Sequence, residues 1–324
     1  MKRLARGAAA LFLVAFANLA MAEWPERPIK IVVPFPPGNS SDVSMRLVGE
    51  KLSTRLGQPV IIENRVGAGG TVGTAYAAKS PADGYTLAMG STGPVTIAKW
   101  LRPDSLPYEP TRDFAVVGPV AWAPQVLIVR KDLPVANFRE FVAYGTKPGN
   151  AYNYGSSGNG TTPHLVIAQM VYQTKLNAEH IPFQGGAQGL TSLIGGQIDF
   201  MSENVPVVQG AIAAGQVKAL GVSSAARIPS MPNLPTLKEQ GAKDFDLQGW
   251  IILMAPKQIP EAVSVKLSGA LDAIMKMPDV RQRLNDLGLV PMDMSRTELA
   301  GFLFAESEKW KHVVENSGAA QTTR

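Results

Sequence analysis

The sequence contains no cysteine and only three histidines. The absence of cysteine excludes disulfide bonds, thiolate nucleophiles, cysteine-ligated metals and a lipid attached to a cysteine after cleavage. None of His164, His180 and His312 has HExxH spacing or stands beside another potential ligand, so we expect neither a metal nor another cofactor. His312 lies near the end of the last predicted helix, where we expect it to be exposed to solvent.

Signatures of several enzyme classes and of nucleic-acid binding are also missing. There is no Walker loop, and residues 155–158 do not match the GxSxG nucleophile elbow. Residues 67–73 resemble a dinucleotide fingerprint, but the last glycine is displaced by one position, which favours a loop or ligand-packing role. Without the first 22 residues the net charge is about +2, and the chain has no basic tract, so we expect no nucleic-acid partner.

The first 22 residues have the three parts of a secretory signal peptide. Lys2, Arg3 and Arg6 form a basic region, and residues 8–17 form an apolar core that is too short to span a bilayer. An Ala-Met-Ala cleavage site follows and ends at Ala22. An uncleaved membrane anchor is the alternative. No later apolar run reaches membrane length, so we expect a mature protein that begins at Glu23 and is soluble in the periplasm.

Strand and helix patterns alternate along the rest of the chain, which predicts an α/β protein with mainly parallel sheets. A mature chain of about 300 residues exceeds what one core usually fills, so we expect two lobes. Two extended apolar runs, residues 116–129 and 247–256, are suited to cross between the lobes. The predicted division gives residues 23–122 and 254–324 to the first lobe and residues 123–253 to the second. The predicted strands are residues 29–33, 60–63, 85–89, 152–154, 180–183, 198–201 and 217–222.

Polar loops follow the predicted strands, and ligands of open α/β sheets bind beyond the carboxyl ends of strands. We therefore expect these loops to converge on one cleft between the lobes. Ser41 and Asp42 open the first helix, where each is either a cap or first-turn acid, or a ligand contact. Ser91 and Thr92 leave the same alternatives open.

The loop after residues 152–154 is richer in hydroxyl groups than one helix cap requires. It contains Ser156, Ser157, Asn159, Thr161 and Thr162, which favours contact with a ligand. Glycine-rich turns and hydroxyl groups can bind a carboxylate without a buried counter-charge.

Aromatic residues are candidates for the apolar walls of the cleft. Phe35 and Phe183 lie next to predicted ligand loops, and Trp250 lies in the second crossing run. The usual role of a lone aromatic side chain is core packing, which is the interpretation that we take for Trp250.

A series of motifs identifies a family resemblance over essentially the whole mature chain. The series includes Val33-Pro34-Phe35-Pro36, Gly67-Ala68-Gly69-Gly70 and Leu193-Ile194-Gly195-Gly196-Gln197-Ile198-Asp199. Further matching segments are residues 24–29, 37–42, 63–65, 83–87, 155–165, 182–186 and 232–236. In this order they resemble the Bug-type periplasmic solute-binding proteins, the receptor component of tripartite tricarboxylate transporters.

The resemblance implies the type II periplasmic-binding-protein fold, in which two α/β lobes joined by two crossing strands close on a ligand in the interdomain cleft. It also implies capture of a small carboxylate by backbone N–H groups, hydroxyl groups and ordered water. By position, the implied contacts are Phe35, Ser41, Asp42, Ser91, Thr92, Ser156, Gly158, Thr161, Phe183, Gly185, Gly186 and Ala187. To these we add Ser157, for its hydroxyl group, and Glu203.

The chain departs from the family pattern at three places. Asn39 and Ser40 replace common glycines, and Phe183-Gln184 replaces a common Tyr-Lys pair. Ser202-Glu203-Asn204 stands where Phe-Asp-Asn is common. The loss of a lysine together with a retained acid argues against a tricarboxylate and favours a monocarboxylate, an aromatic acid or a neutral solute.

The resulting hypothesis is a monomeric, non-enzymatic receptor without catalytic residues, which delivers a small organic acid to a membrane permease. A sensor that presents its ligand to a membrane kinase is an alternative that sequence cannot separate from transport. A further alternative is an enzyme on the same scaffold, such as a hydrolase that uses Asp42 or Glu203.

Overall fold

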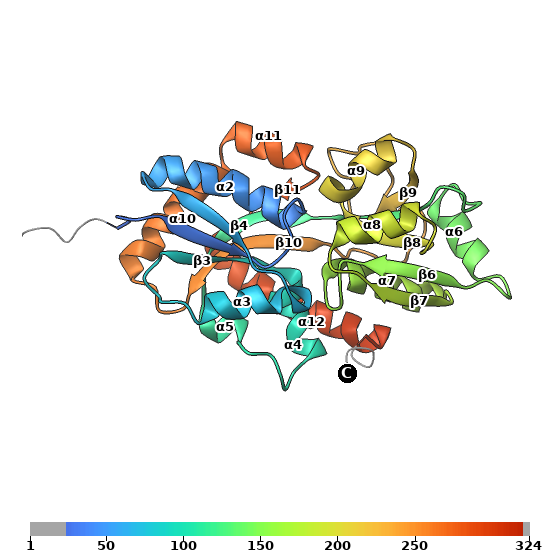
Figure 1. The fold of residues 1–324 in the computed structure, drawn as a ribbon, viewed down its shortest axis with the longest axis horizontal. Coiled ribbons are helices and arrows are strands. Elements are labelled where there is room, and N and C mark those ends of the chain that lie inside the picture. The colour runs from blue at the N-terminus through green and yellow to red at the C-terminus, as the bar shows by residue number, and fades with distance from the viewer. Residues whose placement is uncertain (1–23, 320–324) are drawn as a thin grey trace, which may run out of the picture.

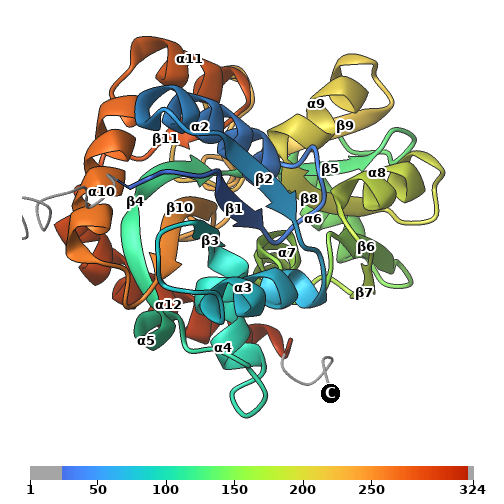
Figure 2. The ribbon, with the colours of Figure 1, turned by 60° about the vertical axis from the view of Figure 1, so that its left-hand side comes forward.

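The computed structural model describes residues 24–319 of the 324-residue chain. Within them the chain forms two α/β lobes that lie side by side, as Figure 1 and Figure 2 show from two directions. The first lobe contains a six-stranded sheet and the second a five-stranded sheet. The predicted α/β class and the two lobes are confirmed. The predicted signal peptide, residues 1–22, lies outside the described residues.

The sheet of the first lobe has the strand order β11-β4-β10-β3-β1-β2. Alternate residues of β1 point to opposite faces, so Ile31 and Val32 are buried in two different clusters. Helices α2, α10 and α11 cover one face, and α3 and α12 cover the other (Figure 1). The strands are β1 (Ile29–Val33), β2 (Val60–Asn64), β3 (Thr86–Ser91), β4 (Phe114–Ala123), β10 (Gly249–Pro256) and β11 (Val290–Pro291). The helices are α2 (Ser40–Leu56), η1 (Ala68–Gly70), α3 (Thr71–Ala78), η2 (Gly93–Ile97), α4 (Ala98–Leu101), α5 (Pro110–Asp113), α10 (Glu261–Met275), α11 (Pro278–Asp286) and α12 (Arg296–Ser317).

The sheet of the second lobe has the strand order β7-β6-β8-β5-β9. One face packs on α6 and α7 through an aromatic group in which Phe141 stacks on Tyr152 with a centroid separation of 5.0 Å. The other face packs on α8 and α9 through aliphatic side chains such as Leu193 and Val208. The strands are β5 (Gln125–Arg130), β6 (Tyr152–Ser156), β7 (Ala178–Pro182), β8 (Phe200–Asn204) and β9 (Val217–Val222). The helices are α6 (Phe138–Gly145), α7 (Thr162–Thr174), α8 (Gly186–Ile194) and α9 (Val205–Ala213).

Two crossing segments join the lobes, as predicted. β4 continues into β5 with only Pro124 between them, and β10 leads back into the first lobe. The expectation of mainly parallel sheets is wrong at these strands, because β10 pairs antiparallel with β3 and β4, and β5 pairs antiparallel with β8 and β9. The reason is geometric. A strand that enters a lobe from the cleft runs opposite to the neighbouring strands, whose carboxyl ends reach the cleft.

The segments that join the lobes also bear on the predicted domain division. β10 is paired in the first sheet from Gly249 onward, although the predicted division gives residues up to 253 to the second lobe. Helix α12 belongs to both cores. Its Leu299 packs in the first lobe, whereas Trp310 and Val313 pack with Leu165 of α7 in the second lobe. The C-terminal helix is therefore a third physical link between the lobes.

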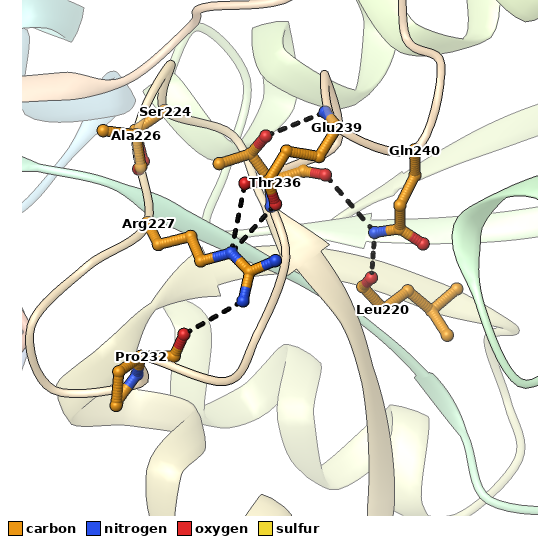
Figure 3. Close-up of polar contacts among 8 residues, drawn as sticks. All are labelled: Leu220, Ser224, Ala226, Arg227, Pro232, Thr236, Glu239 and Gln240. Atoms are coloured by element: carbon orange, nitrogen blue, oxygen red, sulfur yellow. Dashed lines mark hydrogen bonds and ion pairs between the residues drawn. The ribbon is translucent and has the colours of Figure 1, made fainter.

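A long loop, residues 223–248, connects β9 to β10 and is held by its own polar network (Figure 3). Arg227 Nε donates to Glu239 Oε2 at 3.0 Å, and Glu239 and Thr236 exchange reciprocal backbone-to-side-chain hydrogen bonds of 2.9 Å. Gln240 Nε2 donates to the Leu220 carbonyl oxygen of β9 at 2.7 Å. These contacts hold residues 227–240 together and tie them to β9.

Candidate functional site

A cleft of about 650 Å³ lies between the two lobes. The first lobe contributes the start of α2 and the cleft ends of β3 and β10, and the second contributes the starts of α7, α8 and α9. The predicted binding residues that line the cleft are Phe35, Ser41, Ser91, Ser157, Thr161, Gly185, Gly186, Ala187 and Glu203. The predicted residues that lie outside its lining are Asp42, Thr92, Ser156, Gly158 and Phe183.

The loop before α2 forms the wall of the cleft on the first lobe. Asn39 is the N-cap of α2, and its Oδ1 accepts a hydrogen bond of 2.9 Å from the backbone N–H of Asp42. Ser40 and Ser41 begin the helix and line the cleft. Because the first N–H groups of a helix have no intrahelical acceptor, this end of α2 presents donors and a positive dipole to the cleft.

Asp42 is buried behind this wall and holds the loop in place. Its carboxylate accepts hydrogen bonds of 2.9 Å from the backbone N–H of Gly38 and from Asn64 Nδ2. It also pairs with Arg46, at 2.9 Å from one guanidinium nitrogen. Burial by itself raises the pKa of Asp42, but the hydrogen bonds from Arg46, Gly38 and Asn64 together hold this pKa below its ordinary value. Asp42 therefore shapes the loop from outside the lining of the cleft.

The hydroxyl-rich loop between β6 and α7 divides into residues that line the cleft and residues that support them. Ser157 lines the cleft and donates its hydroxyl hydrogen to Glu203. Thr161 also lines it and donates to the Gly158 carbonyl oxygen at 2.7 Å. Ser156 is fully buried and lies 2.7 Å from His180 Nε2. The sequence pattern identified this loop but could not separate the two groups.

His164 and His180 form a stacked pair beneath the same loop. Their ring centroids are 3.9 Å apart with an interplanar angle of 10°. Burial, together with the charge of His180, lowers the pKa of His164 to about 3, and burial lowers the pKa of His180 to about 4. His164 Nδ1 accepts a hydrogen bond of 3.2 Å from the backbone N–H of Gly160, which fits a neutral ring.

The third histidine lies in a different environment, and the described part of the chain offers no metal ligand set. The His312 side chain is 71% exposed, as predicted, and lies 3.4 Å from Glu315. Within residues 24–319 no three histidine or acidic side chains are grouped as metal ligands.

The start of α8 forms the next part of the second-lobe wall. Gly185 is its N-cap with φ of 127°, a conformation that favours glycine, and Gly186 and Ala187 begin the helix. Phe183 instead lines a neighbouring hollow of about 580 Å³, which shares Ser157 and Thr161 with the cleft. It lies close to Gly155, where an added Cβ would come within 3.1 Å of its ring.

Glu203 is a buried acid in the wall of the second lobe. It is 2% exposed, and its Oε1 accepts a hydrogen bond of 2.9 Å from the backbone N–H of Asn204. Burial raises the pKa of Glu203 to about 7, against the lowering effect of hydrogen bonds from Ser157 and Asn204. The predicted strand of residues 198–201 is displaced, since β8 spans Phe200–Asn204 and places Glu203 within the strand.

Sequence reasoning did not assign Ser40, Gln125 or Asn204 to the binding site, although all three line the cleft. Ser40 donates a hydrogen bond of 2.8 Å to Asn204 Oδ1, which joins the two lobes across the cleft. Gln125 donates from Nε2 to the Ala123 carbonyl oxygen at 2.9 Å, and its buried Oε1 has no hydrogen-bond partner. A polar residue directly after Pro124 in an otherwise apolar run was a signal for this site.

The first-lobe side of β3 and β10 completes the cleft. Ser91 Oγ is buried without a hydrogen-bond partner and lines the cleft. Thr92 is buried and accepts a hydrogen bond of 3.0 Å from the backbone N–H of Trp250. Trp250 belongs to the core, as expected, where its ring nitrogen donates to Glu306 at 2.9 Å, but it also borders the cleft.

The electrostatic character of the cleft comes from backbone more than from charged side chains. Helices α2, α7, α8 and α9 all begin at it, whereas its described lining contains no lysine, arginine or histidine. Helix N-termini favour anions because their free N–H groups and dipoles point outward. The arrangement is therefore suited to hold a small anion reversibly.

A family model described as tripartite tricarboxylate transporter family receptor matches residues 44–319. The chain belongs to this family. The resemblance that the sequence motifs indicated is thereby confirmed over most of the chain.

Relatives of this receptor-family chain match it over nearly its full length. A protein of Agrobacterium vitis, from the TAR-I ttuE-ttuC' intergenic region, is 37% identical over 304 residues, which cover 92% of this chain and 87% of that protein. BugT of Bordetella pertussis is 33% identical over 305 residues, which cover 94% and 93% of the two chains.

Solved structures of similar proteins, which include periplasmic binding protein BugD, confirm the predicted periplasmic-binding-protein fold. An R. palustris protein with adipate has a TM-score of 0.87 and 30% identity, covering 91% of this chain and 99% of that one. MatC from Rhodopseudomonas palustris, with bound malate, has a TM-score of 0.82 and 32% identity, covering 90% and 100%. In the described part of the receptor, no helix is both long and apolar enough to cross a membrane.

Proposed function

We propose that this protein is a periplasmic receptor that captures a small organic carboxylate in the interlobe cleft and delivers it to the membrane subunits of a tripartite tricarboxylate-type transporter. The observation that carries the proposal is the convergence of four helix N-termini on a cleft between two lobes. Such a site stabilises an anion through backbone dipoles and N–H groups, and it releases the anion more readily than a buried ion pair would.

The membership of the family supports this function, and so do the ligands of similar proteins. The family model describes transporter receptors, and two solved structures of similar proteins hold adipate and malate, which are both small carboxylates. The predicted signal peptide supports delivery to the periplasm. The family also supports transfer to a permease, because its model describes receptors of a transporter.

The proposed ligand contacts are the predicted residues that line the cleft. On the first lobe they are Ser41 and Ser91, and on the second they are Ser157, Thr161 and the start of α8. Phe35 supplies an apolar wall. Asp42, Thr92, Ser156 and Gly158 act through the loops that they hold.

The proposed receptor is not an enzyme. The alternative, a hydrolase, rests on one contact. Ser157 donates to Glu203, so a hydroxyl group and a carboxylate meet within the cleft. The described lining of the cleft contains no histidine, the residue that usually activates a serine. If the receptor role is correct, a bound ligand recovered after long incubation is chemically unchanged by nuclear magnetic resonance, whereas recovery of a cleaved product favours the enzyme.

The main test is a thermal-shift screen of the purified protein against a panel of mono-, di- and tricarboxylates, followed by calorimetry. We expect at least one carboxylate to raise the melting temperature and to bind at one site per chain. A panel in which only uncharged solutes bind contradicts the carboxylate role.

Loss of uptake of that ligand in cells without the receptor tests delivery to a permease. The sensor role and the monomeric state remain predictions. The cells without the receptor also test the sensor role, because gene expression that depends on the membrane kinase should then no longer respond to the ligand.

A further inference from the structure

The one ionisable side chain in the described lining of the cleft is acidic, which is unusual for a site that binds carboxylates. This side chain is that of Glu203, and among the described lining residues no cationic side chain faces it. A ligand with two carboxylates would therefore bring its second negative charge toward a protein carboxylate without a counter-charge. Like charges in a poorly solvated site repel strongly, so this cleft discriminates against a second anionic group near Glu203.

The carboxylate of Glu203 occupies a place where an anionic group of a ligand could otherwise bind. An added Cβ at Gly186, the first residue of α8, would lie 2.4 Å from Glu203 Oε2, so the carboxylate lies against the first turn of this helix. The N-terminus of a helix is where an anionic ligand group would bind. On the second lobe the protein places its own carboxylate there. The corresponding place on the first lobe, at Ser40 and Ser41 of α2, has no such acid in the lining.

The Glu203 side chain is also fixed rather than free to move away. The Ser157 hydroxyl group donates to it, and the Asn204 backbone N–H donates to its Oε1 at 2.9 Å. An ionised carboxylate has about four acceptor positions, so these two donors leave others for a ligand. The group that fits these positions is a hydrogen-bond donor.

A second acceptor lies on the neighbouring strand. Gln125 is paired with Asn204 across β5 and β8, and its Nε2 is engaged by the Ala123 carbonyl oxygen. This orientation leaves the buried Oε1 of Gln125 without a donor at the cleft. On the first lobe, Ser91 Oγ is buried at the cleft without a partner, and a hydroxyl group can donate to a carboxylate. At these positions the second lobe therefore presents acceptors, at Glu203 and Gln125, and the first lobe presents a donor at Ser91.

We propose that the ligand is a small monocarboxylate whose other end donates hydrogen bonds, with the carboxylate at the start of α2 and the donor group at Glu203 and Gln125. An amide, a hydroxyl or an ammonium group meets this requirement, whereas a second carboxylate does not. The inference rests on the proposed carboxylate receptor and narrows its substrate class. Glu203 acts in it as a specificity-determining residue.

The experiment compares matched acids by calorimetry at about pH 8, above the folded pKa of about 7, so that Glu203 is mostly ionised. The ligands are succinate, glutarate and adipate, each beside its monoamide of the same chain length. We expect a monoamide to bind at least about tenfold more tightly than the diacid of equal length. In Glu203→Gln this preference should shrink or reverse, because the new amide can donate to a second carboxylate. Glu179→Gln, at an exposed position of β7, removes the same charge from the same lobe and should keep the native preference.

The outcomes separate this inference from the proposed function. Tighter binding of diacids by the native protein overturns the substrate class and leaves the carboxylate receptor intact. Equal preference in Glu203→Gln and the native protein overturns the role of Glu203. No binding of any carboxylate, in this set or in the wider panel, overturns both proposals. If Glu203→Gln fails to fold, the comparison of matched acids on the native protein still decides the substrate class.

Discussion

Ser40 and Asn204 join the two lobes directly, through a hydrogen bond of 2.8 Å from the serine hydroxyl to the amide oxygen. Ser40 is the first residue of α2 in the first lobe, and Asn204 is the last residue of β8 in the second. An added Cβ at Gly185 would also lie within 3.3 Å of Pro36, so the loops of the two lobes approach each other on the same side. These contacts belong to a closed arrangement of the lobes, the form that binds ligand in hinge proteins.

Ser40→Ala should weaken ligand binding by favouring the open arrangement. A neutral hydrogen bond contributes about 0.5–1.5 kcal/mol, so affinity should fall about two- to tenfold. Calorimetry measures the loss, and small-angle scattering should show a smaller contraction on ligand addition than in the native protein. Ser44→Ala is the matched control, because Ser44 is buried on the same helix but donates locally to the Ser41 carbonyl oxygen. Equal losses in both variants would mean that the interlobe bond does not matter.

Asp42→Asn should destabilise the protein by about 1–3 kcal/mol near neutral pH, because it replaces a buried carboxylate that accepts from Arg46, Gly38 and Asn64. The pKa of Asp42 lies below its unfolded value, so its stabilising effect is present above that value and is lost as pH falls through the folded pKa. The difference in melting temperature should therefore disappear in acid.

Asp279→Asn provides the control for that variant. Asp279 is also a first-turn acid, but it lies on the surface at α11 and pairs there with Lys51. Exposed ion pairs contribute little, so this substitution should change the melting temperature only slightly. A loss as large as that of Asp42→Asn would assign the effect to the helix dipole instead of the buried network.

Glu203→Gln should gain stability over the native protein as pH rises. The folded pKa of Glu203 is about 7, above its unfolded value of 4.5. The stabilisation that comes from protonated Glu203 is thus fully present below the unfolded pKa. As pH rises through the folded pKa, the free energy of unfolding falls by an amount on the order of 3 kcal/mol. Glutamine stays neutral and avoids this loss. Melting temperatures across this range measure the gain, and Glu179→Gln should not show it.

The stacked histidines should make the protein sensitive to acid. Both folded pKa values, about 3 for His164 and about 4 for His180, lie below the unfolded value of 6.5. The stabilisation that comes from the two neutral rings is therefore fully present above the unfolded pKa. It is lost as pH falls toward the folded pKa values. His180→Gln keeps a hydrogen-bonding group near Ser156 and removes one titration, so its melting temperature should fall less steeply in acid. His312→Gln removes an exposed histidine and should follow the native curve.

Local sequence determined most of the elements. The β-branched run before Pro34 forms β1 at the predicted residues, and β9 also matches. Gly57 ends α2 in the left-handed conformation, and Ser295 with Glu298 forms a capping box at the start of α12. These features depend on backbone preferences and on side chains a few residues apart, which a sequence displays directly.

The sequence also indicated the loops of the candidate site, but their roles depend on contacts between distant residues. Ser156 and Ser157 are neighbours, yet one is buried on His180 and the other reaches Glu203 at the cleft. The pairing of His164 with His180, the position of Gln125 and the bond between Ser40 and Asn204 depend on the sheet order and on how the lobes meet. Burial decides which hydroxyl group a ligand can reach and, as at Glu203, how far the pKa of an acid is raised. Burial is a property of the packed chain as a whole, because it depends on residues that lie far apart in the sequence.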